Sequence, residues 1–250
     1  SVYYYADTQI LARAAKMFGY AEDYEKYSRL AADIRKAIND KYLDAQKGIY
    51  ASGTQTELSV PLYWGIVPDE FKAKVAHNLN EKVIASGHHL DVGVLGCKAL
   101  LNALCENGYT ETAYKVAVQD TYPSWGWWVK QGFTTLAETW ELSPVFKDAS
   151  VDHVFLGDVA AWYVNDLAGI NFDSERPGFE HIIIRPHFPE GLEWVDASYD
   201  SIKGTIRSAW KRSKGKMVLE IEIPVGTQAT LIMPDGSQQA LKPGYQRLVM

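Results

Sequence analysis

Aromatic rings and carboxyl groups are concentrated in one short stretch of the chain. Residues 125–144, WGWWVKQGFTTLAETWELSP, hold four tryptophans within sixteen positions, together with Glu138 and Glu141. Flat indole rings pack against the C–H faces of a sugar, while polar groups bind its hydroxyls. A carboxyl group beside such rings can serve as an acid or a base in glycosidic cleavage. The stretch therefore favours a carbohydrate site, and plain core packing of the tryptophans is the alternative.

The two acids of this stretch differ in what they can do. Glycoside hydrolysis uses two carboxyl groups that flank the scissile bond. Glu138 and Glu141 are three residues apart, so on a helix they share one face and do not face each other across a substrate. On the residues alone, Glu138 is a candidate catalytic group with a structural acid as the alternative, and Glu141 is interpreted as part of a charge cluster.

The tryptophans divide between a pocket wall and a core. Alternation along an extended backbone places Trp125 and Trp127 on one side and Trp128 on the other. Core packing accounts for one or two of these rings, whereas a cluster in a glycine-containing loop favours a pocket. We therefore expect one or more of Trp125, Trp128 and Trp140 to line a site.

Histidines form a second group of candidates. His88, His89 and Asp91 lie close together, but no well-spaced further ligands accompany them, so a polar loop that contacts a ligand is favoured over a metal site. His153 is predicted to open a helix, where its imidazole can cap the helix or reach a ligand. Glycine-rich phosphate loops and the G-x-S-x-G motif are absent, and we predict neither a metal nor a cofactor.

Helices must position these residues over the first two thirds of the chain, because apolar residues recur there at helical spacing. Their short connections predict antiparallel hairpins, stacked as a solenoid or closed into an α/α toroid. Longer connections at residues 50–56, 87–93 and 120–143 are the expected binding loops. Helices are predicted over residues 10–18, 24–38, 56–65 with a bend near Pro61, 69–85, 94–105, 110–119 and 153–168.

After Ile170 the apolar period falls to two, which is typical of strands. Six short strands at about ten-residue spacing predict a small antiparallel β-sandwich. We expect a helical domain at residues 1–172 and a β domain at residues 173–250. The strand candidates are HIIIRPHF, WVDASYDS, GTIRSAWKR, MVLEIEIP, QATLIMP and LKPGYQRLVM.

Composition bounds the class of partner. The formal net charge is −6, and Lys and Arg do not gather in one run, which argues against a nucleic acid or an anionic membrane as partner. No apolar run approaches the roughly 20 residues that span a bilayer. The start, SVYYYADTQI, lacks an initiator Met and signal-peptide features, so we expect it to lie within a longer protein. Cys97 and Cys105 fall about 12 Å apart on one predicted helix, so packed thiols are expected.

Several of these motifs occur in an order that resembles a known family. The chain is similar to the bacterial α-L-rhamnosidases of glycoside hydrolase family 78 over nearly its whole length. The motifs that carry the resemblance are GTQT (53–56), GHHLDVGVLG (87–96), YPSWGWW (122–128), GFTTLAETW (132–140), DHVFLGDVAAWYVNDLAGI (152–170) and the tail that begins PGFEHIIIRPHFPEGLEW.

The resemblance implies an (α/α)6 barrel followed by a β-sandwich. It also implies hydrolysis of terminal α-L-rhamnose from glycosides or polysaccharides with inversion and without a metal. Glu138 matches the general base, His153 a residue that contacts the sugar, and Trp125 a residue beside the pocket. Such proteins are compatible with a periplasmic or extracellular location, and a cytoplasmic one stays open.

The chain departs from the family pattern at several positions. Ala137, Thr139 and Asp152 stand where the family often has Trp, Arg and Asn. The general acid of the family lies in an acidic, Arg-rich segment upstream, which these 250 residues lack. We therefore expect a C-terminal piece with part of the barrel, whose partner is the rest of the polypeptide and which is inactive alone. A non-catalytic carbohydrate-binding module and an α/α-barrel hydrolase for another sugar are the alternatives.

Overall fold

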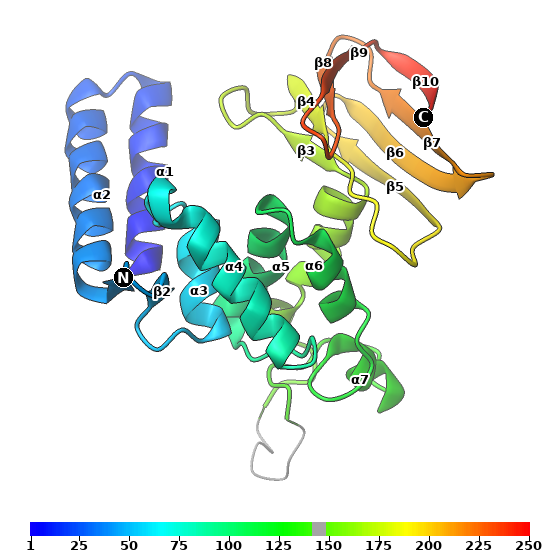
Figure 1. Ribbon diagram of the computed structural model, residues 1–250. Coiled ribbons are helices and arrows are strands. Elements are labelled where there is room, and N and C mark those ends of the chain that lie inside the picture. Colours follow the sequence, from blue (N-terminus) through cyan, green and yellow to red (C-terminus); the bar gives the residue numbers. More distant parts are fainter. Residues whose placement is uncertain (142–148) are drawn as a thin grey trace. The chain divides into compact units, whose positions relative to one another are not determined.

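Helices dominate the first part of the chain and strands the second (Figure 1). The computed structural model describes residues 1–141 and 149–250, so the end of the predicted loop at residues 142–143 lies outside the described residues. Contacts divide the chain into two units, Ser1–Leu156 and Gly157–Met250. Helical hairpins followed by a small β domain confirm the predicted fold class.

The first unit is built from helices that pack as neighbours. Its elements are α1 (Val2–Phe18), α2 (Ala21–Tyr42), β1 (Leu43–Asp44), β2 (Ile49–Tyr50), α3 (Gln55–Tyr63), α4 (Asp69–Ala85), α5 (Val94–Glu106), α6 (Thr110–Ala117), α7 (Trp125–Lys130) and the 3-10 turn η2 (Val154–Leu156). The hairpin of α1 and α2 is clear in Figure 1. In addition, α3 packs against α4 and α5, and α5 packs against α6.

Local sequence features set several helix boundaries. α1 ends at Gly19, whose φ of 74° lies in the left-handed region that glycine enters without penalty. α3 begins with a capping box, in which the Glu57 N–H donates to the Thr54 hydroxyl and the Thr54 N–H donates to the Glu57 carboxylate. α4 begins with acidic residues in its first turn, which complement the positive end of the helix dipole.

α5 forms the centre of the helical core, as its nearly uniform apolar sequence predicts. Leu100 and Leu104 are fully buried, and both cysteines are buried thiols as predicted. A Cβ atom at Gly96 would collide with the Thr56 side chain, so glycine at this position allows α5 to approach α3 closely. The close approach joins the GTQT segment to the helix that follows the 87–93 loop.

Two predictions about local structure are wrong. Residues 153–168, expected as one helix, form η2, then α8 (Asp158–Trp162) and the π-helical turn η3 (Tyr163–Leu167). Gly157, with φ −93° and ψ 3°, interrupts the helical conformation between η2 and α8. The segment after Ser124, expected as an extended loop, forms α7. Trp125 and Trp128 therefore share one helical face, and both are buried.

The second unit contains two four-stranded sheets, in the orders β3-β4-β8-β9 and β10-β7-β6-β5. All described pairs are antiparallel except β4 with β8, which is parallel and differs from the wholly antiparallel expectation. The strands are β3 (Ile170–Phe172), β4 (His181–Ile184), β5 (Trp194–Ser201), β6 (Gly204–Ser213), β7 (Lys216–Ile223), β8 (Gln228–Ile232), β9 (Gln238–Leu241) and β10 (Gly244–Val249).

Alternate residues of these strands form one apolar core between the two sheets. It includes Ile182 and Ile184 of β4, Trp210 of β6, and Ile221 of β7, all at most 2% exposed. The Trp210 indole N–H donates to the Leu167 carbonyl at 2.7 Å, which satisfies its buried donor. Residues on the opposite face of the β10-β7-β6-β5 sheet point away from this core.

Candidate functional site

Three of the predicted site residues form a single aromatic cluster in the helical unit. The Trp140 ring stacks on Trp128, with centroids 4.6 Å apart and planes at 18°, and meets Trp125 edge to face at 5.5 Å. The Trp125 indole N–H donates to the Leu156 carbonyl at 2.7 Å, and that of Trp140 donates to the Val92 carbonyl at 2.6 Å. The cluster therefore ties together three segments that are distant in the sequence.

The three rings differ in exposure. Trp125 and Trp128 are 7% and 2% exposed, so the core interpretation fits these two. Trp140 is half-buried. The Trp128 Nε1 atom is buried and has no hydrogen-bond partner among the described residues, which leaves a donor in the cluster for a water molecule or a hydroxyl group.

Glu138 lies where two chain segments run side by side. Its backbone N–H donates to the Ser150 carbonyl at 2.9 Å, and the Ser150 N–H donates to its Oε2 at 3.0 Å. The side chain is half-buried, and Oε1 has no partner within the described ranges. One carboxylate oxygen is thus fixed by the backbone of the neighbouring segment.

The same pair of segments carries His153. Its N–H donates to the Leu136 carbonyl at 2.7 Å, so residues 136–138 pair with residues 150–153. Its Nδ1 accepts from the Phe155 N–H at 3.4 Å, and its ring meets the Phe155 ring edge to face. His153 precedes a 3-10 turn and does not open a helix, contrary to the prediction. The backbones of His153 and Glu138 nevertheless lie in the same pair of hydrogen-bonded segments.

His89 and Asp91 lie on the 87–93 connection, which Trp140 contacts through Val92. Both ring nitrogens of His89 are engaged, Nδ1 with the Ser86 carbonyl at 3.0 Å and Nε2 with the Thr121 hydroxyl at 2.7 Å. The Asp91 side chain is exposed. His89 thus joins two connections, whereas Asp91 presents its carboxylate to solvent.

His88 occupies a strained position in this connection. Its φ of 61° lies in the left-handed region, which is uncommon for a residue other than glycine. Burial lowers the pKa of the His88 imidazole, with smaller contributions from Lys115 and His89. Its imidazole therefore favours the neutral form.

Gln55 is a site residue that the sequence interpretation missed. Its side chain is fully buried at 0% exposure. The amide nitrogen donates to the Ser86 hydroxyl at 3.2 Å and to the His89 carbonyl at 2.9 Å, and the amide oxygen accepts from the Asp91 N–H at 2.9 Å. Gln55 therefore fixes the connection that bears His89 and Asp91. The T-x-x-E capping box at Thr54 places it at the first turn of a helix, but no sequence feature gives its partners.

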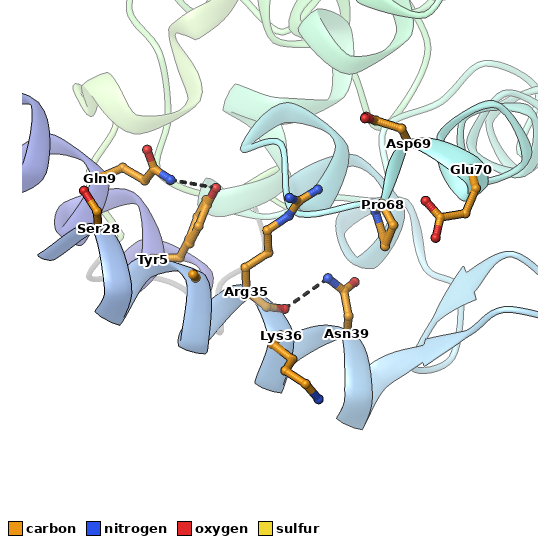
Figure 2. Close-up of a pocket in the computed structure, with 10 residues that line it drawn as sticks. Tyr5, Gln9, Ser28, Arg35, Lys36, Asn39, Pro68, Asp69 and Glu70 are labelled. Atoms are coloured by element: carbon orange, nitrogen blue, oxygen red, sulfur yellow. Dashed lines mark hydrogen bonds between the residues drawn. The ribbon is translucent and has the colours of Figure 1, made fainter. Parts of the chain in front are cut away.

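A separate polar hollow of about 560 Å³ lies in the same unit, between α1, α2 and the start of α4 (Figure 2). None of the predicted site residues lines it. The Arg35 guanidinium donates to the carbonyls of Ile66 and Val67, so its charge holds α2 against the connection before α4. Asn39 donates to the Ile66 carbonyl and accepts from the Tyr50 hydroxyl, and burial raises the pKa of Tyr50 to about 12. These hydrogen bonds hold α2 against β2 and against the connection before α4, so we assign the residues beside this hollow a structural role.

Two further properties concern the described residues. Within residues 1–141 and 149–250, no three His, Cys, Asp or Glu side chains lie close enough together to hold a metal ion. No helix in those ranges has the length and apolar character needed to cross a membrane.

Comparison with known proteins agrees over both units. Residues 1–167 match the bacterial α-L-rhamnosidase 6-hairpin glycosidase domain, and residues 169–248 match the bacterial α-L-rhamnosidase C-terminal domain. An α-L-rhamnosidase of Streptomyces avermitilis is 30% identical over 94% of this chain and 23% of its own length. The chain thus spans about a quarter of the length of this relative.

Solved structures give the same result. The structure of a Streptomyces avermitilis α-L-rhamnosidase complexed with L-rhamnose covers all of this chain with a TM-score of 0.92 and 28% identity, over 26% of its own chain. The structure of an α-L-rhamnosidase from Dictyoglumus thermophilum covers 92% with a TM-score of 0.86 and 34% identity, over 26% of its own chain. The chain belongs to the bacterial α-L-rhamnosidase family of glycoside hydrolases, since its two parts match the 6-hairpin glycosidase domain and the C-terminal domain in that order.

Proposed function

We propose that the protein to which this chain belongs removes terminal α-L-rhamnose from glycosides or polysaccharides with inversion, and that Glu138 is the general base. The observation that supports this most is the environment of Glu138. Oε2 is held by the Ser150 N–H at 3.0 Å, while Oε1 has no partner in the described part of the chain. A general base needs this combination, because its orientation must be fixed while one oxygen remains open to water.

In the proposed reaction, Glu138 takes a proton from a water molecule while the water oxygen bonds to the anomeric carbon. The bond from that carbon to the leaving oxygen breaks, and a general acid gives its proton to the leaving oxygen. Inverting glycosidases hold the two carboxyl groups about 6.5–9.5 Å apart, which leaves room for the water. The acid is proposed to come from sequence upstream of the 250 residues, which on their own should be inactive.

The remaining predicted residues take supporting roles in this proposal. Trp140, on its buried base of Trp125 and Trp128, provides an apolar wall that excludes water around the sugar. His153 is proposed to contact the sugar from the segment that pairs with Glu138, and His89 and Asp91 from the connection that Gln55 fixes. Residues 1–172 are proposed as part of the catalytic domain, with residues 173–250 as its C-terminal companion.

A matched pair of variants in the longer protein tests the role of Glu138. Glu138→Gln removes the base and should lower release of rhamnose from an aryl α-L-rhamnoside by about 10²–10⁴-fold. Glu141→Gln, an exposed residue of the same type, should retain wild-type turnover. The first sugar detected by proton NMR should be the β anomer. Wild-type rates for Glu138→Gln, or an α anomer as first product, contradict the proposal.

The other interpretations give different outcomes. A hydrolase for another sugar should prefer a different aryl glycoside in a panel of substrates. The feature that favours this alternative is the small, buried side chain of Ala137 beside Glu138. A non-catalytic carbohydrate-binding module should bind glycans and release no sugar from the longer protein. Turnover by the purified 250-residue chain would contradict an upstream acid.

A further inference from the structure

The outer face of the β10-β7-β6-β5 sheet assembles side chains that the sequence analysis did not combine. Strand register places Trp194 opposite Lys211, and Asp196 opposite Ala209, which in turn lies opposite Glu220. These residues alternate with those that enter the core, so they share the outer face. Together with Arg207 they line a hollow of about 170 Å³, whose floor includes the small side chain of Ala209.

Trp194 presents its ring to solvent from an ordered backbone. The side chain is 67% exposed, although it lies within the edge strand β5. Arg212 on the neighbouring strand fixes the backbone that leads into Trp194. Its guanidinium donates to the Phe188 and Leu192 carbonyls at 2.8 and 3.2 Å, and its N–H donates to the Glu193 carbonyl at 2.9 Å. An exposed indole on an ordered support can bind a ligand without a large loss of conformational entropy.

The polar groups of the hollow are arranged before any ligand binds. Arg207 donates from Nε and Nη2 to the two carboxylate oxygens of Asp196, each at 2.8 Å. Its Nη1 lies 3.6 Å from Glu220 Oε2. Two acids, Arg207 and Lys211 give the hollow no net charge. Anionic membranes and nucleic acids need a basic surface, so this arrangement disfavours both.

We propose that this hollow binds one pyranose ring of a neutral glycan. The apolar face of the ring packs on the Trp194 indole, Asp196 and Glu220 accept hydrogen bonds from hydroxyl groups, and Lys211 donates to them. One aromatic plane beside several donors and acceptors matches a sugar, whose C–H faces are apolar and whose rim is hydroxylated. The site lies wholly within the second unit and needs no residue of the Glu138 site.

Binding is tested on the full chain labelled with 5-fluorotryptophan. Fluorine NMR resolves the tryptophan resonances, and Trp194→Phe assigns that of Trp194. The probes are the methyl glycosides of L-rhamnose, D-glucose, D-galactose and D-mannose at millimolar concentration, with heparin as a polyanion. At least one neutral glycoside should shift the Trp194 resonance. No shift with any neutral glycoside, or a shift with heparin alone, overturns the proposal.

Variants locate the site by calorimetric titration with the glycoside that binds. Trp194→Ala should weaken its affinity about tenfold, which corresponds to about 1.4 kcal/mol. Lys211→Ala, on the exposed rim, should also weaken it and serves if Trp194→Ala fails to fold. Tyr245→Ala removes an exposed ring from the same outer face outside the hollow and should bind as wild type. Unchanged affinity in Trp194→Ala and Lys211→Ala, or equal loss in Tyr245→Ala, refutes the site.

Kinetic measurements on two variants distinguish a failure of this inference from a failure of the proposed function. Trp194→Ala in the longer protein should retain the kcat and KM of wild type on a small aryl α-L-rhamnoside, and Glu138→Gln should retain the glycan-induced shift at Trp194. Loss of the shift in Glu138→Gln would overturn an independent site. Failure of Glu138→Gln to lower hydrolysis would contradict only the proposed base.

Discussion

The helical unit positions its candidate site with single side chains, whereas the β unit positions its outer face with backbone ladders. Gln55 and Trp140 each bridge segments far apart in sequence through one or a few hydrogen bonds. In contrast, Trp194 and Arg207 are placed by continuous pairing of β5 with β6. Loss of one side chain should therefore disturb a site in the first unit and leave a face of the second nearly unchanged.

Two glutamines give the sharpest contrast. Gln55→Ala leaves the Asp91 N–H without its acceptor and removes one of the two donors to the His89 carbonyl, the other being the Ser86 hydroxyl. It should lower the free energy of unfolding by about 1–3 kcal/mol, the cost of one buried group left unpaired. Gln228→Ala, at an exposed position of β8, removes an acceptor for Arg176 and should change the free energy of unfolding by less than about 0.5 kcal/mol. Urea unfolding of both variants measures the difference.

Under the proposed function Gln55 is a positioning residue, so the kinetics of the longer protein provide a second readout. Gln55→Ala should lower kcat/KM for an aryl α-L-rhamnoside. Gln55→Glu retains an acceptor for the Asp91 N–H and should recover part of that loss. Equal effects of Gln55→Ala and Gln228→Ala on unfolding would remove the contrast between the two units.

Two buried tryptophans test how each unit satisfies its polar groups. Trp210→Phe leaves the buried Leu167 carbonyl without its indole donor and should cost about 1–3 kcal/mol. Trp128→Phe removes an indole N–H that has no partner among the described residues, so only the loss of volume should count, at about 1 kcal/mol. Thermal and urea unfolding rank the two variants. A larger loss for Trp128→Phe would mean that its donor is satisfied in solution, by water for example.

Sequence predicted regular elements better than the connections between them. α4 runs from Asp69 to Ala85 as expected, because its apolar spacing and acidic first turn agree. The helix predicted at residues 153–168 is broken because Gly157 leaves the helical conformation, although the apolar period continues through it. β3 and β9 were missed, since three or four residues are too few to give a period of two.

The candidate site was predicted by residue type more than by geometry. Trp140 and Glu138 follow from an unusual concentration of aromatic and acidic residues. The partners that fix them, Val92 and Ser150, are ordinary residues 48 and 12 positions away and carry no pattern. Long-range side-chain bonds depend on the tertiary fold, so a single sequence gives the chemistry of this site and leaves its supports open.

Acid should remove more stability from the β unit, through the carboxylate of Asp173, than from the helical unit, through that of Glu57. Hydrogen bonds from His181, the Glu175 N–H and Arg176 hold the pKa of Asp173 at about 2, below its ordinary value of 3.8. The Thr54 N–H and then the Ser52 hydroxyl lower the pKa of Glu57. A lowered pKa stabilises the folded state above the ordinary value, and this stability is lost as pH falls through the folded pKa.

Urea midpoints of wild type, Asp173→Asn and Glu57→Gln across acid pH measure this effect. The difference between wild type and Asp173→Asn should be full above pH 3.8 and disappear toward pH 2. The corresponding change for Glu57→Gln should be smaller, because its partners, the Thr54 N–H and the Ser52 hydroxyl, are uncharged, whereas Asp173 also pairs with the charged Arg176. A pH-independent difference for Asp173→Asn would show that packing, and not charge, accounts for its effect.

The smallest expected difference in stability is between variants of two ion pairs. Arg29 and Glu25 on α2 are both 72% exposed and share one contact, whereas Arg207 and Asp196 are 29% and 48% exposed and share a two-bond contact. Glu25→Gln should cost about 0–0.5 kcal/mol and Asp196→Asn about 0.5–1 kcal/mol, because a rigid bidentate geometry loses less side-chain entropy on pairing. At 1 M salt, where charges are screened beyond about 3 Å, the cost of Glu25→Gln should vanish while part of the Asp196→Asn cost remains. Equal costs that vanish together in salt would mean that the two-bond geometry adds nothing to the Arg207–Asp196 pair. The order of the outer face would then come from the backbone alone.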